Sequence, residues 1–527
     1  MRASRPTLLS LAVLLLAVGA AEVTAAQAHD LVLRGGRIID GTGRDAFEAD
    51  IAIRDGIVVA IGDLANVAGG EELDVSGLVV SPGFLDTHSH AGPGLTTAAL
   101  SPARPLLAQG ITTVFVNPDG SGAVDMVAQR EALEREALGV NVAQFVPHGA
   151  VRRSVLGMAD RQADGAELDA MRALVRAAME AGAWGLSSGL FYAPGSFAEL
   201  DEVIALARVA AEFNGVYQSH VRDESDYSIG IMASLEEVVS VGREADLPVV
   251  HTHIKALGPN VWGRSAAIVE RIEAARAAGV EIYADQYPYL ASATSLAAAL
   301  VPRWAQAGGE EAFRLRMADP PQAARVVAGM EENLARRGGA ARIQFRRVRS
   351  NPALEGRSLA EVAAEFERTP VEVALGLFAR GDPGIVSFNM QAEDVRRLMV
   401  QPWMMTASDG GLVPLREGVP HPRSYGTFPR RIRTFVLEQG LEPLEQAIRS
   451  MTGLPAKVYG VPDRGVLRVG AIADLAVFDP AALVDPATFT DPHRLAEGMT
   501  HVLVAGRFAI RGGAFTGIRA GRVLQRR

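Results

Sequence analysis

The chain has 527 residues, of which 48% are hydrophobic and 21% are charged. This composition is typical of a folded protein and excludes a disordered, collagen-like or coiled-coil chain, and the length exceeds that of one ordinary domain. The formal net charge of −9 provides no global attraction to nucleic acid, and a chain without cysteine cannot form disulfides, iron–sulfur clusters or cysteine-ligated zinc sites.

Residues 1–28 have the pattern of a secretory signal peptide. Arg2 and Arg5 precede an apolar run from Leu8 to Ala21, and Ala26-Gln27-Ala28 has the form of a cleavage site. An uncleaved membrane anchor is the alternative, because no polar residue interrupts the second half of the run. We expect cleavage near Ala28 and export of the mature protein, most simply to the periplasm.

Both ends of the mature chain contain short β-strand patterns. Residues 29–80 have brief apolar or alternating runs separated by glycine and aspartate turns, and residues 456–527 repeat this style. Because these two segments flank one long central region, we expect them to build a single small β-sandwich together.

The central region, residues 81–455, alternates strand patterns with Ala- and Glu-rich helical patterns. Eight such units predict a (β/α)₈ barrel of the TIM type, with an insertion at about 303–360 between the seventh and eighth strands. The predicted strands are Leu78–Leu85, Thr112–Val116, Ala143–Val146, Gly182–Leu186, Val216–Gln218, Pro248–Val250, Glu281–Ala284 and Trp403–Thr406.

Histidines follow several of these strands. His88 and His90 form a His-x-His pair after the first strand, where alternate residues share a face, and His220 and His253 follow the fifth and sixth strands. The carboxyl ends of barrel strands converge on one face, so these imidazoles can meet at a metal ion. A single histidine of this kind is more often a core or surface residue, and the combination favours metal ligation.

Asp409 follows the eighth strand in Ser408-Asp409-Gly410-Gly411. A carboxylate beside a metal can bind the ion and can also accept a proton from an activated water, so Asp409 is the candidate general acid and base. The alternative is an ordinary turn aspartate.

With these residues assembled, the chain resembles the amidohydrolase superfamily and, more narrowly, the N-acyl-D-amino-acid deacylase (D-aminoacylase) family. The matching stretches run in order over nearly all of the mature chain; they include Gly110-Ile111-Thr112-Thr113, His148-Gly149-Ala150-Val151-Arg152, Gly185-Leu186-Ser187-Ser188-Gly189-Leu190, Ser219-His220-Val221-Arg222 with Glu224, His253-Ile254-Lys255, Asp285 to Tyr289, and His421 to Arg430. The resemblance implies zinc-dependent hydrolysis of a linear amide.

One position departs from the family pattern. The family commonly has Gly-Asn-Cys-Gly after the second strand, with the thiolate as a zinc ligand, whereas this chain has Asn117-Pro118-Asp119-Gly120. A carboxylate can replace the thiolate and can bridge two ions, although a turn-forming Pro-Asp-Gly is the simpler interpretation. The resemblance implies that His220, His253 and Asp119 hold the main zinc ion, and that His88, His90 and Asp409 offer a second position.

The chain has only two lysines, Lys255 and Lys457, and neither lies on the fourth strand. Hydantoinases and dihydroorotases, which the chain resembles in fold, bridge two metals with a carbamylated lysine on that strand. The absence of a lysine there disfavours cyclic-imide hydrolysis.

We therefore expect an enzyme that deacylates N-acyl-D-amino acids, with one or two zinc ions and a small-molecule substrate. The free carboxylate of that substrate requires a fixed cation and hydrogen-bond donors. The candidates are Lys255, Arg423, Arg222, Tyr287, Tyr289 and Ser292.

Two alternatives remain open. A dipeptidase or a hydrolase of peptides that contain D-amino acids would use the same metal site on another substrate. A non-catalytic barrel that binds a ligand through a weakened metal site is the second alternative. The sequence leaves the preferred side chain, the number of metal ions and the oligomeric state open.

Overall fold

A computed structural model describes residues 29–526 of the chain, so the proposed signal peptide lies outside the described residues. Within residues 29–526, no helix combines the length and the hydropathy needed to cross a bilayer.

The centre of the molecule is a series of parallel strands that pair in chain order. They are β6 (Phe84–Asp86), β7 (Ile111–Val116), β8 (Asn141–Gln144), β9 (Val146–Pro147), β10 (Gly185–Gly189), β11 (Val216–His220), β12 (Val249–His251), β13 (Ile282–Gln286) and β17 (Met404–Thr406). Strands β8 and β9 form one strand position interrupted at Phe145. A parallel bridge between Ser89 and Gly410 joins the segments that follow the first and last strands. This order agrees with the predicted (β/α)₈ barrel.

Helices connect these strands and cover them on the outside. The main ones are α3 (Met126–Glu134), α4 (His148–Leu156), α5 (Gly165–Glu180), α6 (Leu200–Ala211), α7 (Ile231–Ala245), α8 (Ser265–Ala277), α14 (Ala392–Met399) and α16 (Leu444–Met451). Helix α5 begins with a capping box in which the side chains of Asp164 and Glu167 each accept the backbone N–H of the other residue. Short helices α1 (Gly92–Leu95), α2 (Arg104–Leu107), α15 (Arg423–Arg430) and α17 (Gly453–Tyr459) and the π-helix η6 (Arg431–Glu438) complete this part.

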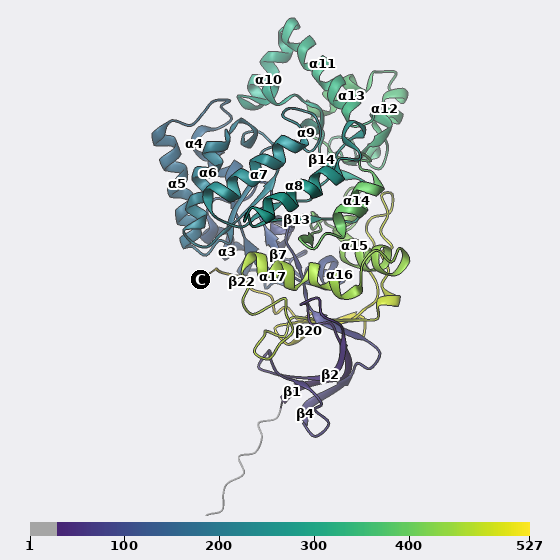
Figure 1. Cartoon of the computed structure of the whole chain (residues 1–527). Helices are drawn as coiled ribbons and strands as arrows, with labels where there is room; N and C mark the ends of the chain where they lie inside the picture. The colour runs from purple at the N-terminus through teal and green to yellow at the C-terminus, as the bar shows by residue number, and fades with distance from the viewer. Residues whose placement is uncertain (1–28, 527) are drawn as a thin grey trace, which may run out of the picture.

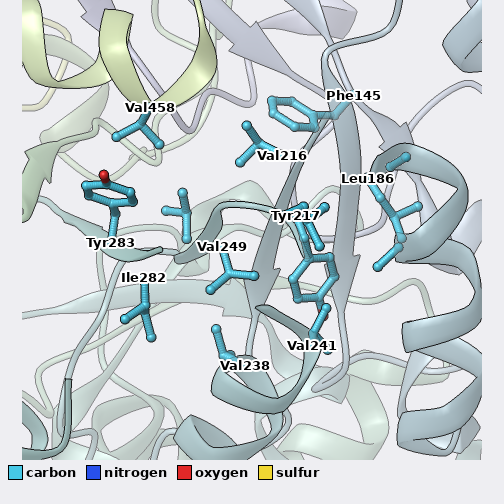
Figure 2. Close-up of a cluster of buried hydrophobic side chains, with 14 of the residues drawn as sticks. Phe145, Leu186, Val216, Tyr217, Val238, Val241, Val249, Ile282, Tyr283 and Val458 are labelled. Atoms are coloured by element: carbon cyan, nitrogen blue, oxygen red, sulfur yellow. The ribbon is translucent and has the colours of Figure 1, made fainter. Parts of the chain in front are cut away.

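Apolar side chains of neighbouring strands form the main core with the helices. Figure 2 shows Val216, Val249 and Ile282, from three successive strands, beside Val238 and Val241 of α7, and all five side chains are buried. Parallel strands are covered on both faces, so they are rich in apolar residues, and the apolar residues of β7, β8 and β12 are the signal by which such strands could be predicted.

The two ends of the chain form a small β domain at one end of the molecule (Figure 1). Its nine-stranded sheet contains β1 (His29–Ile38), β2 (Phe47–Arg54), β3 (Ile57–Gly62), β4 (Gly69–Asp74), β5 (Val79–Pro82), β18 (Leu475–Phe478), β19 (Met499–Val504), β20 (Arg507–Arg511) and β21 (Ala514–Phe515). A shared core joins Leu33 and Ile51 from one end to Val477 and Leu503 from the other. The sheet is continuous, and an isolated antiparallel bridge joins Ile57 of its edge strand β3 to Ile472 in the C-terminal segment.

The structure differs from the sequence-based expectation at both ends of the barrel region. The predicted first barrel strand is two strands, because β5 pairs in the sheet of the small domain and only β6 belongs to the barrel. At the other end, β22 (Val523–Leu524) leaves the small domain and pairs with β8, and the indole of Trp184 donates to the carbonyl of Leu524. A two-residue strand has no periodicity that a sequence pattern could reveal.

The insertion between β13 and β17 is larger than the expected 303–360. It comprises β14 (Ser292–Ser295), α9 (Leu296–Leu300), α10 (Gly309–Ala318), α11 (Pro320–Arg336), β15 (Ile343–Arg347), α12 (Leu359–Glu365), α13 (Pro370–Phe378) and β16 (Gly384–Ser387). Its strands form an antiparallel sheet in the order β14–β16–β15, and it has a hydrophobic core of its own. In Figure 1, α10 to α13 lie at the end of the molecule opposite the small β domain. Strand β14, Ser-Ala-Thr-Ser, lacks an apolar pattern, which explains why its part in the insertion escaped prediction.

Candidate metal centre and active site

The six residues predicted to bind metal lie together at the carboxyl ends of the barrel strands. They are His88 and His90 after β6, Asp119 after β7, His220 at the end of β11, His253 after β12 and Asp409 after β17. All have nearly buried side chains except His90, whose side chain is 40% exposed. The structure thus gathers groups that are up to 321 positions apart in the sequence.

The carboxylate of Asp119 lies in the middle of this group. Its Oδ1 atom is 3.2 Å from Nε2 of His88 and 3.4 Å from Nε2 of His253. The same oxygen is 3.7 Å from Nδ1 of His220, and Oδ2 is 3.3 Å from Nε2 of His90. Asp119 therefore stands where the family thiolate was expected, with both oxygens directed at imidazoles.

Asp119 belongs to two overlapping sets of possible metal ligands. One set joins it to His88, His90 and Asp409, and the other joins it to His220 and His253; within each set the candidate ligand atoms lie within 4.8 Å of one another. Several of these atoms are buried without a hydrogen-bond partner among the described residues, namely both ring nitrogens of His88 and His220 and Oδ1 of Asp119. Buried polar atoms without partners are costly, and nitrogen and carboxylate donors around one point suit a zinc ion.

The backbone at three of these residues is in the left-handed region. The φ angles are 56° at Asp119, 35° at His253 and 47° at Asp409. Residues other than glycine rarely adopt such angles, and strained backbone of this kind is concentrated at functional sites. The fold thus holds these side chains in positions that an ordinary strand end would not give them.

Buried acids beneath the site fix the backbone that carries the ligands. The carboxylate of Asp285 accepts hydrogen bonds from the backbone N–H of His253 at 2.5 Å and from the hydroxyl of Thr87 at 3.2 Å. Asp86 accepts the backbone N–H of Ser408 at 2.7 Å. These contacts tie the first, sixth, seventh and eighth strands together directly under the ligands.

Glu224 is a site residue that reasoning from the sequence missed. It is 4% exposed, accepts a hydrogen bond from Nζ of Lys255 at 2.5 Å, and its Oε1 atom is 3.1 Å from Nδ1 of His253. A carboxylate on the second ring nitrogen fixes the orientation of a histidine that binds metal through the first. The available signal was its place four residues after His220 in a stretch that matches the family.

The protonation states follow from burial and from neighbouring charges. Burial is the main reason that the pKa of His220 falls to about 3, so this imidazole is neutral at neutral pH and can donate a lone pair to a metal. Burial alone would raise the pKa of the Asp119 carboxyl, but the surrounding imidazoles hold it well below its usual range. The side chain of His90 is 40% exposed; its partial removal from water lowers its pKa, but Asp119 and Asp409 raise that pKa to about 9. The two carboxylates thus create a place that attracts positive charge, from a proton or from a divalent cation.

A cavity of about 900 Å³ opens beside the six residues. This volume is in the range of sites for small molecules. Loops at the barrel strand ends form one side of the cavity, and residues of the insertion, including Thr294, Arg337 and Arg346, form another.

Four of the six predicted substrate-binding residues line this cavity: Lys255, Tyr287, Ser292 and Arg423. Nη1 of Arg423 lies 2.8 Å from Oδ2 of Asp409, and its guanidinium group stacks 4.7 Å from the centre of the Tyr287 ring. The hydroxyl of Ser292 donates to the side chain of Asn389 at 3.1 Å. The structure therefore places two cations and two hydroxyl groups where a substrate carboxylate could bind.

Two predicted substrate-binding residues lie elsewhere. Nε of Arg222 is 2.9 Å from Glu237, and its other nitrogens donate to the carbonyls of Ser196 and Ala198, so it does not line the cavity. Arg222 lies two residues beyond the end of β11, in a loop where the alternation of a strand does not fix the direction of a side chain.

The hydroxyl of Tyr289 donates to Asp485 at 3.0 Å, and its ring stacks against Arg430. Tyr289 therefore joins the barrel to the C-terminal segment and does not line the cavity. The sequence did not reveal this contact because Asp485 is 196 positions away.

Nearly the whole chain is similar to known proteins. Residues 71–510 match the amidohydrolase family. The D-aminoacylase of Alcaligenes xylosoxydans xylosoxydans is 36% identical over 523 residues, which covers 95% of this chain and 98% of that protein. The N-acyl-D-glutamate deacylase of the same organism is 36% identical over 525 residues, with 94% of this chain and 96% of that protein covered.

Solved structures show the same relationship. One is a crystal structure of N-acyl-D-glutamate deacylase from Bordetella bronchiseptica, complexed with zinc and a phosphonate inhibitor that mimics the tetrahedral intermediate. It has a TM-score of 0.82 and 34% identity to this chain, and the match covers 95% of this chain and 100% of that chain. A crystal structure of D-aminoacylase has a TM-score of 0.81 and 34% identity, with 94% and 100% covered. A D-hydantoinase structure, at 14% identity and a TM-score of 0.58, shares the fold alone.

Proposed function

This chain belongs to the amidohydrolase family and, within it, to the N-acyl-D-amino-acid deacylases, and from that premise we propose that it hydrolyses the amide bond of N-acyl-D-amino acids with the help of bound zinc. The observation that carries the proposal is the gathering of four imidazoles and two carboxylates beside a cavity of suitable size. The relatives support the reaction and the stereochemistry, because their names specify deacylation of D-amino acids.

The residues present fit a zinc site. His220, His253 and Asp119 would hold one ion, and His88, His90 and Asp409, together with Asp119, offer a second position. Zinc bound there would supply a Lewis acid that polarises the substrate carbonyl and acidifies water. The carboxylate oxygens of Asp119 face the two sets of imidazoles, so the replacement of the family cysteine by aspartate is compatible with one ion or two.

Asp409 is the residue placed to move the proton. Its carboxylate faces the two histidines of the first strand, with Oδ1 3.1 Å from Nε2 of His90, and it lines the cavity. Burial raises its pKa, but Arg423 and the imidazoles outweigh that effect and hold the pKa far below its usual range. Asp409 is therefore ionised in the resting enzyme, can accept a proton from the attacking water, and can pass that proton to the leaving nitrogen.

Arg423, Lys255, Tyr287 and Ser292 would fix the carboxylate of the amino acid. Lys255 is held by Glu224 at 2.5 Å and Arg423 by Asp409 at 2.8 Å, so both cations are in place before a substrate binds. Side chains that are already held in place lose less entropy when they bind an anion. A substrate carboxylate fixed by these residues would also hold the scissile amide at a set distance from Asp409.

We also propose that the protein is exported to the periplasm after cleavage near Ala28. The support is the basic, apolar and small-residue pattern of residues 1–28. Mass spectrometry of the protein from the periplasmic fraction should give an N-terminus at His29. Recovery of the chain with Met1 intact in the cytosol would refute this proposal.

A chirally resolved assay tests the function. Protein depleted of metal and then loaded with zinc should release free amino acid from N-acetyl-D-amino acids, and it should do so much faster than from the L-enantiomers or from dipeptides. Faster turnover of dipeptides would favour the peptidase alternative. Retention of zinc without turnover of any amide would favour a non-catalytic role.

A further inference from the structure

The cavity contains more cations than its acids can pair with. Of the three carboxylates that line it, Glu224 is paired with Lys255, Asp409 with Arg423, and Asp119 lies among the imidazoles. Further arginines line the cavity as well, and one of them, Arg346, has a side chain that none of these acids neutralises.

The guanidinium group of Arg346 makes no ion pair or hydrogen bond with any of residues 29–526, and its Nε atom is buried. Burial lowers the pKa of Arg346, and the positive charge of Arg423 lowers it further. Arg346 as a whole is half-buried, and a charge that is partly removed from water without an acidic partner is costly. An anion bound in the cavity would supply the partner that Arg346 lacks among residues 29–526.

The backbone is built to direct this side chain into the cavity. Arg346 lies on β15, at a point where the register with β16 shifts: Phe345 pairs with Ile385 and Arg347 pairs with Gly384, so Arg346 is the extra residue of a β-bulge. Bulges re-aim side chains and are frequent beside active sites. A Cβ atom on Gly384 would lie 2.6 Å from Nε of Arg346, so the glycine leaves room for the side chain.

We propose that Arg346 binds a second carboxylate of the substrate, so that the preferred substrates are N-acyl-D-amino acids with two acidic groups. This inference rests on the proposed deacylase function and specifies its substrate class. The planar guanidinium group can bind a carboxylate through two parallel hydrogen bonds. A dianionic substrate would place one carboxylate at Arg423 and Lys255 and the other at Arg346, and it would reduce the repulsion between the two arginines.

The second carboxylate can belong to the side chain of the amino acid or to the acyl group, and the chemistry of recognition is the same. Three substrates distinguish the two sources: N-acetyl-D-glutamate, N-succinyl-D-leucine and N-acetyl-D-leucine. We expect the zinc-loaded wild-type enzyme to have a higher kcat/KM for one of the two dicarboxylates than for N-acetyl-D-leucine, and the preferred dicarboxylate identifies the source.

The variant Arg346→Met should lower kcat/KM for the preferred dicarboxylate about 10- to 100-fold, which is the value of a hydrogen-bonded charge pair, and should change that for N-acetyl-D-leucine less than about threefold. For the preferred dicarboxylate, kcat/KM of Arg346→Lys should lie between the values of the wild-type enzyme and of Arg346→Met. The matched control is Arg347→Met, the next residue on the same strand, which pairs with Glu417 and does not line the cavity. It should leave the ratio between the substrates unchanged.

Thermal unfolding in the presence of ligands supplies a second readout. If the second carboxylate belongs to the amino-acid side chain, free D-glutamate should raise the midpoint of thermal unfolding of the wild-type protein more than D-leucine does. If it belongs to the acyl group, succinate should raise the midpoint more than acetate does. In either case R346M should abolish the difference.

Three results would overturn the inference. The first is a wild-type enzyme that prefers N-acetyl-D-leucine to both dicarboxylates, which requires no variant to fold and leaves the deacylase function intact. The second is an equal loss for all three substrates in R346M, which would assign Arg346 a structural role. The third is a zinc-loaded enzyme that turns over no N-acyl-D-amino acid, which would end the proposed function together with this inference.

Discussion

Replacing Asp119 with asparagine tests whether one carboxylate connects the two sets of metal ligands. Asparagine has nearly the same shape and tolerates the left-handed φ of 56° found at this position. The substitution therefore removes the charge and adds little backbone strain. Because Asp119 belongs to both sets, its loss should weaken every zinc position at once.

The expected magnitude follows from the contacts of Asp119. Its two oxygens lie 3.2 to 3.7 Å from nitrogens of four imidazoles. Replacing a residue that only supports a metal ligand lowers metal affinity about 10- to 100-fold. Replacing a direct ligand should therefore lower the zinc affinity at least about 100-fold. With zinc in excess over both dissociation constants, this equals about 2.7 kcal/mol less stabilisation of the folded protein by zinc.

The assay is a competition titration in which a chelator of known affinity and the metal-free protein compete for zinc. Asp394→Asn is the control, since Asp394 is a buried acid outside the site that accepts the backbone N–H groups of Gly263 and Ser265. It should bind zinc as the wild-type protein does. A wild-type zinc affinity and stoichiometry in Asp119→Asn would refute the central position assigned to this carboxylate.

Three further predictions concern the residues around the site. Asp409→Asn should lower kcat about 100- to 10,000-fold, as the loss of a general acid and base does, and zinc analysis of the purified variant should find the metal largely retained; near-normal turnover would exclude the proton-transfer role. Glu224→Gln should weaken zinc binding about 10- to 100-fold in the same chelator titration, because it removes the charge that orients His253 and holds Lys255, and an unchanged affinity would show that this contact is incidental. Arg222→Met should leave KM within about twofold and should instead lower the free energy of unfolding by about 1–3 kcal/mol in a urea titration, and a large rise in KM would restore Arg222 to the substrate site.

The parts of the site that could be predicted lie directly at strand ends. His220 is the last residue of β11, and His88 and His90 lie in the segment that directly follows β6, so their meeting follows from the convergence of barrel strands on one face. Asp119 and Asp409 were recognised as candidates, but their left-handed backbone is a tertiary constraint that no local pattern reveals.

The parts that could not be predicted depend on contacts between distant segments. Arg222 and Tyr289 have the right chemistry for a carboxylate, yet their directions are set by Glu237 and Asp485, and a loop residue has no periodicity to show where it points. Arg346 lies in a bulge on an inserted strand, and its pairing with β16 is fixed only when the insertion folds around its own core. The insertion itself was underestimated because its first and last strands along the chain, β14 and β16, are short and β14 is polar.

The most direct test of the account is a crystal structure of the zinc-loaded protein with data collected at the zinc absorption edge. The account predicts an anomalous peak within about 2.0–2.2 Å of a carboxylate oxygen of Asp119 and of ring nitrogens of His220 and His253, with a second peak near His88 and His90 if two ions bind. A strong peak elsewhere, or no peak among these side chains in crystals that contain zinc, would contradict it.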